Sequence, residues 1–129
     1  MIDKQMVLGL IERKQEGGYW DFKEQWHDNK ASLLHDIICL ANNLEKRDAY
    51  LIIGVKDGDY SIVGVNVSDA NRKNTQELTD FLRTKNFVGS TRPMVKVENI
   101  TLDDGKVLDV VIIEESKNTS FTLSADYRE

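Results

Sequence analysis

The sequence of 129 residues carries a net charge of −5 at neutral pH, with 40% hydrophobic and 30% charged residues. This composition is typical of one globular domain, and no apolar run has the length of a membrane span. Proteins that bind nucleic acid only by neutralising phosphates usually have a basic excess, so the charge argues against a purely electrostatic binder. A local basic surface or a set of acidic metal ligands remains compatible with it. The single cysteine excludes an internal disulfide and favours a reducing, cytoplasmic setting.

The first elements are a helix and a strand separated by a glycine bend. A short helix is predicted over 3–13, with Asp3 as its N-cap. After the two glycines, an amphipathic strand is predicted at 19–25. Trp20 and Phe22 are expected on one face of this strand, with the charged side chains on the other.

The middle of the chain predicts a longer helix and then a strand pair. The helix over 31–44 has an apolar stripe, and we expect Cys39, which lies within that pattern, to be a buried structural thiol. The continuous apolar run at 50–55 is typical of a strand covered on both faces. An Asp-Gly pair at 57–58 predicts a hairpin turn, with the chain returning as a strand at 60–65.

The remaining pattern predicts a helix that starts at Thr75 and a second strand pair at 95–102 and 107–113. The whole chain, 1–129, therefore indicates one α+β (mixed α/β) domain. We expect a sheet of about five strands packed with two main helices, plus the short N-terminal helix.

Three carboxylates stand near predicted strand ends. Glu16 and Asp21 flank the glycine bend, and Asp57 follows the apolar strand. Carboxylate oxygens are the ligands that Mg²⁺ or Mn²⁺ prefers, and such an ion activates water and stabilises charge on a scissile phosphate. From spacing alone the simpler interpretation is stronger: Glu16 is a loop residue and Asp57 belongs to a common Asp-Gly turn.

A basic segment contrasts with the acidic chain around it. In one interpretation, the lysine and arginine side chains of this segment contact phosphates and Phe87 stacks on a base. The other is a solvated helix end with Phe87 in the core. The basic residues are Arg83, Lys85, Arg92 and Lys96. His27 and His35 lack partners at metal-ligand spacing and are interpreted as structural.

Four ordered pieces of the sequence resemble the Schlafen-type, Alba-like (AlbA_2) DNA-binding domain family. They are Glu16-x4-Asp21-Phe22-Lys23, then 34–42 (LHDIICLAN), then 50–57 (YLIIGVKD), and finally 62–65 (IVGV). The resemblance covers nearly the whole chain. It implies a β-α-β-β-α-β-β unit and DNA binding in a transcriptional regulator.

In some animal Schlafen proteins two such lobes form a pseudo-dimer that cleaves tRNA and rRNA. Carried over residue by residue, the resemblance implies Glu16, Asp21 and Asp57 as the metal-binding and catalytic acids. This chain departs from the family pattern in three ways. Asp21 replaces the more usual Glu, a charged turn replaces an Asn-Thr-Gly-Gly segment after the helix, and Ser120 stands where relatives usually have proline. The chain resembles the N-terminal domain of a longer protein.

Three functional hypotheses follow. The first is a cytoplasmic nucleic-acid-binding domain (DNA or RNA), without membrane association, whose phosphate contacts are Lys23, Arg83, Lys85, Arg92 and Lys96. The second is an endoribonuclease that uses Mg²⁺ or Mn²⁺ held by Glu16, Asp21 and Asp57, with Lys23 assisting at the phosphate. The third is a homodimerisation or interaction module without nucleic-acid contact, which the net charge favours.

Overall fold

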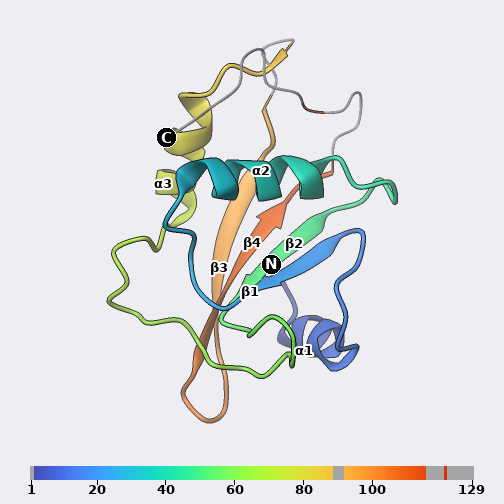
Figure 1. Ribbon diagram of the computed structural model, residues 1–129, viewed down its shortest axis with the longest axis vertical. Helices are drawn as coiled ribbons and strands as arrows, with labels where there is room; N and C mark the ends of the chain where they lie inside the picture. The colour runs from blue at the N-terminus through green and yellow to red at the C-terminus, as the bar shows by residue number, and fades with distance from the viewer. Residues whose placement is uncertain (1, 89–91, 116–120, 122–129) are drawn as a thin grey trace.

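The structure, a computed structural model, describes residues 2–88, 92–115 and 121 (Figure 1). Its elements in chain order are α1 (Lys4–Glu12), β1 (Trp20–Lys23), α2 (Lys30–Ala41), β2 (Ala49–Ile53), α3 (Thr75–Arg83), β3 (Val95–Thr101) and β4 (Val107–Ile113). The strands form one sheet in the order β1-β2-β4-β3, in which β1 and β2 are parallel and the other neighbours are antiparallel. The α+β class expected from the sequence is confirmed.

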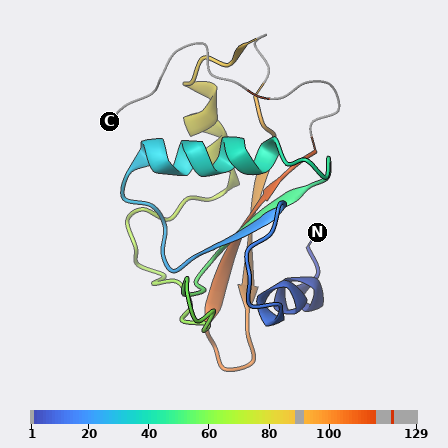
Figure 2. The ribbon, with the colours of Figure 1, turned by 45° about the vertical axis from the view of Figure 1, so that its right-hand side comes forward.

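The helices cover both faces of the sheet. Figure 1 shows α2 crossing the front of the sheet, and Figure 2 shows α1 on the opposite side at the lower end. The face under α2 and α3 buries Leu33, Ile37, Leu51, Leu78 and Val111, among others. The face under α1 buries Val7, Phe22, Ile52, Leu108 and Val110, among others. The central strand β2 is buried at every position, as its continuous apolar run predicts.

Short polar side chains start all three helices. Asp3 and Asn29 each accept a backbone hydrogen bond from the first turn, at 2.9 and 3.1 Å. Asn74 forms a reciprocal capping box with Glu77, at 2.8 and 2.9 Å. These bonds satisfy backbone N–H groups that have no partner inside a helix, and they fix where each helix begins.

The prediction of about five strands is wrong, because residues 60–65 do not form one. Val55 and Ile62 make only an isolated bridge. The carbonyl oxygen of Gly54 accepts from both Val63 and Gly64 N–H, each at 2.9 Å, and Lys56 N–H donates to the Ser61 carbonyl oxygen at 2.8 Å, so the antiparallel pairing is limited to this one bridge. Among the described residues the sheet therefore has four strands, and the segment after Asp57 is a loop.

The helix predicted over 31–44 ends at Ala41, and the expected burial of Cys39 is also wrong. Asn43 donates side-chain hydrogen bonds to the carbonyl oxygens of Leu40 (2.9 Å) and Arg47 (2.7 Å), which turns the chain away from the helix axis. Leu44 then lies outside the stripe and is 96% exposed. Cys39 is exposed because it lies on the side of α2 that faces away from the sheet. No helix in the described part of the chain is long and apolar enough to cross a membrane.

Candidate functional site

The strand β1 lies at one edge of the sheet, paired only with β2. Its burial alternates: Trp20 and Phe22 are buried, whereas Asp21 and Lys23 point to the other face and are half-buried. The carbonyl oxygen of Lys23 accepts hydrogen bonds from the N–H groups of Gly54 (2.7 Å) and Val55 (3.2 Å). Because these bonds join the ends of two parallel strands, the loop that carries Asp57 starts beside the end of β1.

The Gly17-Gly18 bend brings Glu16 back towards β1. Trp20 packs its ring on Gly17 so closely that a Cβ at that position would lie 2.2 Å from the ring. The Gly17 N–H also donates to the Trp20 carbonyl at 3.2 Å. Only glycine fits this close approach, and the resulting turn places the Glu16 carboxyl within hydrogen-bonding contact of Asp21.

The neighbouring acids affect the protonation of Glu16. Partial burial, the hydrogen bond with Asp21, and the charges of Asp21 and Asp57 together raise the pKa of Glu16 from 4.5 to about 7, against the opposing charge of Lys23. Two carboxyl groups in contact share a proton more readily than they carry two charges. At neutral pH the Glu16 carboxyl is therefore protonated for about half of the time.

A divalent metal ion fits this set only in part. Glu16 and Asp21 are in contact, and Asp57 is close enough to affect the Glu16 pKa. Within the described ranges, however, no three His, Cys, Asp or Glu side chains are grouped so that they could hold a metal ion. The arrangement shown is a carboxyl pair with a third acid nearby, and it is not a formed three-ligand centre.

Lys23 links the carboxyl pair to α2. Its ammonium lies 3.9 Å from Asp21 Oδ2 and 3.7 Å from Asp36 Oδ2, and Asp36 Oδ2 also contacts His27 Nε2 at 2.6 Å. Burial of Asp36 would raise its pKa, but the His27 hydrogen bond and the Lys23 charge outweigh burial and lower it. The buried Nδ1 of His27 has no hydrogen-bond partner among the residues described.

The sequence analysis missed the roles of Asp36 and His27. The available signal was weak: Asp36 lies in the second turn of the helix that follows the His27 turn. Only the fold places both side chains beside Lys23.

The other predicted basic residues do not join this cluster. Arg83 is exposed with Asp80 at 3.9 Å, and the Lys85 ammonium lies 4.9 Å from the Phe81 ring centroid. Lys96 alternates with Val95 and Val97, which pack towards α3, so it points to the opposite face of the sheet. Arg92 is half-buried beside the buried Pro93.

The structure decides between the two interpretations of Phe87. The side chain is 7% exposed and packs edge-to-face against Phe121, with ring centroids 6.3 Å apart. A buried ring cannot stack on a base, so Phe87 belongs to the core.

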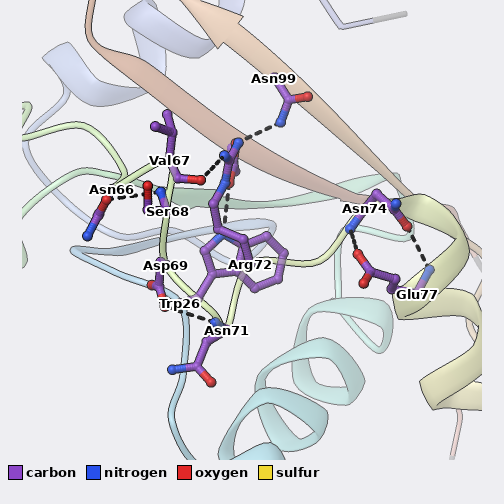
Figure 3. Close-up of polar contacts among 11 residues, drawn as sticks. Trp26, Asn66, Val67, Ser68, Asp69, Asn71, Arg72, Asn74, Glu77 and Asn99 are labelled. Carbon is purple, nitrogen blue, oxygen red and sulfur yellow. Dashed lines mark hydrogen bonds and ion pairs between the residues drawn. The ribbon is translucent and has the colours of Figure 1, made fainter.

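A second polar network, around Asp109, holds the loops beside the sheet. Asp109 is 1% exposed and accepts hydrogen bonds from Trp26 Nε1 (2.8 Å), Asn99 Nδ2 (2.7 Å) and two nitrogens of Arg72 (2.8 and 2.9 Å). Figure 3 shows Arg72 reaching in from its loop beside Trp26 and Asn99. Burial of Asp109 opposes ionisation, but these donors outweigh it and lower the pKa. Because every donor comes from a different segment, the network fixes the loop over 66–74 to the sheet.

A cavity of about 360 Å³ lies between segments 24–28 and 63–71. Glu24, Asp28 and Asp69 line it, and its lining includes no lysine or arginine among the residues described. An acid-lined cavity without a cation repels phosphate, so we do not place a nucleic-acid contact there.

Comparisons with known proteins agree with this architecture. A search of curated proteins finds no match. Among solved structures, the chain is similar to the solution NMR structure of the N-terminal domain of a RecG-related protein from Nitrosomonas europaea. The identity is 21% and the TM-score 0.61, over 100% of this chain and 89% of that one. This likeness shows a shared fold.

A comparison with models of protein families also gives a match. The model of the family described as "Schlafen, AlbA_2" matches residues 16–128, from Glu16 of the β1 motif almost to the last residue. The resemblance drawn from the four sequence pieces is thereby confirmed. This chain belongs to the Schlafen AlbA_2 family.

Proposed function

We propose that this chain is a nucleic-acid-binding domain of a transcriptional regulator and that it presents the edge of the sheet formed by β1 to a phosphate backbone. The observation that carries the proposal is the convergence of Glu16, Asp21, Lys23 and Asp57 at that edge. Membership of the Schlafen AlbA_2 family supports it. The similar solved domain comes from a protein titled "Putative ATP-dependent DNA Helicase RecG-related Protein", which also points towards DNA.

Lys23 is the central phosphate contact in this proposal. Its side chain is 35% exposed and is held between Asp21 and Asp36, so its position is fixed before a ligand arrives. A phosphate must compete with these carboxylates for the ammonium. Protonation of Glu16 near neutral pH reduces the negative charge that the phosphate meets. Arg83, Lys85, Arg92 and Lys96 are proposed as further phosphate contacts outside this cluster.

Fluorescence anisotropy with labelled duplex DNA and RNA, at two salt concentrations, tests the proposal. We expect binding that weakens as salt rises, because phosphate contacts release condensed counterions. Lys23→Gln should weaken binding about three- to tenfold. Lys106→Gln is the matched control: it also loses one positive charge, but that lysine pairs with Asp104 at the β3–β4 turn and should leave binding unchanged. Absence of binding to both nucleic acids at low salt would overturn the proposal.

Metal-dependent RNA cleavage is the second candidate. One observation favours it: besides partial burial, Asp21 and Asp57 both raise the pKa of Glu16, the acid matched to the family motif. The incomplete metal site places this candidate second. Incubation of tRNA with Mn²⁺ and the protein, compared with Asp57→Asn, separates the two. Cleavage that depends on Asp57 would support catalysis, whereas equal cleavage by both proteins, or none by either, would remove the catalytic assignment.

A further inference from the structure

Two arginines lie on two touching aromatic rings at the start of β1. The guanidinium carbon of Arg47 is 3.8 Å from the centroid of the Tyr19 ring, and that of Arg13 is 5.1 Å from the Trp20 ring. The two rings meet edge-to-face with centroids 4.7 Å apart. Arg13, Tyr19, Trp20 and Arg47 are called the arginine–aromatic patch below. None of these residues entered the proposed function.

The backbone around the patch is held by hydrogen bonds. Asn43 is 9% exposed, and its side chain bonds both the carbonyl oxygen (2.7 Å) and the N–H (3.3 Å) of Arg47. On the other side, Trp20 Nε1 donates to the carbonyl oxygen of Gln15 at 2.9 Å, which ties the segment after α1 to β1. Both arginines are therefore presented from fixed turns.

The two guanidinium groups are exposed and have their charges available. Both residues are exposed, and within the described part of the chain neither forms an ion pair. The polar contact of the Arg47 guanidinium is a 3.4 Å bond from Nε to the Asp48 carbonyl oxygen. The neighbouring Asp48 carboxylate accepts the N–H of Glu115 at 2.7 Å instead. An arginine that stacks on an aromatic ring still has its guanidinium N–H groups available for phosphate. Because its side chain is already positioned, less side-chain entropy is lost on binding.

The patch and the carboxyl pair are neighbours around the start of β1. Tyr19 directly precedes β1 and lies two residues from Asp21, a separation of about 7 Å in an extended chain. A nucleic-acid strand advances about 3.4 Å per nucleotide in a helix, so neighbouring phosphates could reach both places. Lys14 and Lys46, both exposed, flank the arginines in sequence and add positive charge. Glu12 and Glu45 in the same segments reduce this positive charge, so the proposal rests on the positions of the two arginines and not on the net charge.

We propose that Arg13 and Arg47 form a phosphate clamp for single-stranded nucleic acid that runs along β1 towards Asp21 and Lys23. This inference rests on the proposed function and adds its location and ligand class. A single strand is favoured because guanidinium planes can also stack on unpaired bases.

Anisotropy titrations of a labelled single-stranded oligonucleotide, made as DNA and as RNA, test the clamp. The test variant is Arg13→Gln/Arg47→Gln. The matched control, Lys4→Gln/Lys106→Gln, loses the same two charges, but those lysines pair with Asp103 and Asp104 near the β3–β4 turn. We expect the test variant to bind about tenfold more weakly and to lower the slope of log affinity against log salt by about 1.4, the value for two lost phosphate contacts. The control should match the wild type.

Tyr19→Leu and Tyr19→Phe test the ring beneath Arg47. Leucine removes the aromatic face without changing charge, so we expect weaker binding, whereas phenylalanine keeps the face and should restore it. Thermal unfolding of each variant checks that the fold is retained. The clamp alone would be overturned if Arg13→Gln/Arg47→Gln bound as tightly as the wild type. It would also be overturned if the control variant lost as much affinity as the test variant. Failure of the wild type to bind any nucleic acid would overturn the proposed function together with it.

Discussion

Glu16 and Asp21 are in hydrogen-bonding contact across the Gly17-Gly18 bend, and partial burial together with this contact raises the pKa of Glu16 to about 7. The relationship exists because Trp20 packs on a glycine that leaves room for its ring. The packing of Trp20 on Gly17 therefore accompanies the approach of Glu16 to Asp21. This pair is the part of the site whose chemistry can be tested directly.

The raised pKa of Glu16 predicts that its effect on stability depends on pH. Because the pKa is about 7 in the folded protein and 4.5 for an ordinary glutamate, the folded state binds more protons between these values, and stability falls as pH rises through them. Glu16→Gln should raise the free energy of unfolding by about 1 kcal/mol at about pH 8, after allowing for solvent screening, and by almost nothing at about pH 5.

Urea unfolding at both pH values measures this difference. Glu12→Gln, at an exposed position near the end of α1, is the matched control and should have the same small effect at each pH. A Glu16→Gln effect that does not change with pH would mean that the pKa of Glu16 is not raised in the folded protein.

Asp109 is predicted to be the most costly polar side chain to alter. Asp109→Asn leaves Arg72 without its carboxylate in a buried network, and loss of one partner of a buried ion pair costs about 3–5 kcal/mol. Because hydrogen bonds lower the Asp109 pKa below its ordinary 3.8, its contribution is fully present above that pH and is lost as pH falls through the lower folded value.

Urea midpoints of Asp109→Asn and Asp104→Asn provide the measurement. Asp104 lies at the exposed β3–β4 turn, and its substitution should leave the midpoint nearly unchanged. Equal midpoints for the two variants would show that the buried network does not stabilise the fold.

Two glycines in the loop after β2 give a matched comparison. Gly54 and Gly58 both have positive φ, +114° and +105°, which disfavours alanine. A Cβ at Gly54 would also lie 2.9 Å from Leu108 and 3.2 Å from Gly64, whereas the space at Gly58 is open. We expect Gly58→Ala to cost about 1–2 kcal/mol and Gly54→Ala about 1–3 kcal/mol more, measured by thermal or urea unfolding. A larger loss of stability for Gly58→Ala than for Gly54→Ala would show that Leu108 and Gly64 do not pack closely against Gly54.

Cys39 should react in the folded protein. It is exposed on α2, with its sulfur 3.5 Å from His35 Nε2. Partial burial and the Asp36 charge raise the thiol pKa, so reaction with a disulfide reagent should be slow near neutral pH and faster under alkaline conditions, since the thiolate is the nucleophile. A thiol that reacts only after denaturant is added would contradict the exposed position.

The sequence predicted the elements well where periodicity controls the structure. The Asp3 cap, the alternation of Trp20 and Phe22 in β1 and the strand at 107–113 are all present in the structure. Local patterns succeed here because caps and alternation act over a few residues.

The errors arose where distant or side-chain contacts control the chain. The Asn43 side chain ends α2, and the antiparallel pairing of 60–65 is limited to one bridge beside Gly54, although both segments have suitable apolar residues. The sequence analysis did not single out Asp109, because its partner Arg72 is 37 positions away.

The candidate site also contains residues that the sequence identified and residues that only the fold brings together. Family motifs identified Glu16, Asp21 and Lys23, which the structure places at one edge. The grouping of Lys96 with Arg83 was inferred from sequence proximity, but a strand and a helix present them on different faces. Arg47 could not have been found, because its contact with Tyr19 depends on the turn that Asn43 builds.

Mapping of amide chemical shifts during titration with a single-stranded oligonucleotide tests the central claim most directly. The account predicts that shifts concentrate in the segment from Arg13 to Lys23 and around Arg47, while the β3–β4 turn at 102–106 stays unchanged. Shifts confined to the end of α3 and to β3, or the absence of any shift at low salt, would contradict the claim that the β1 edge is the nucleic-acid interface.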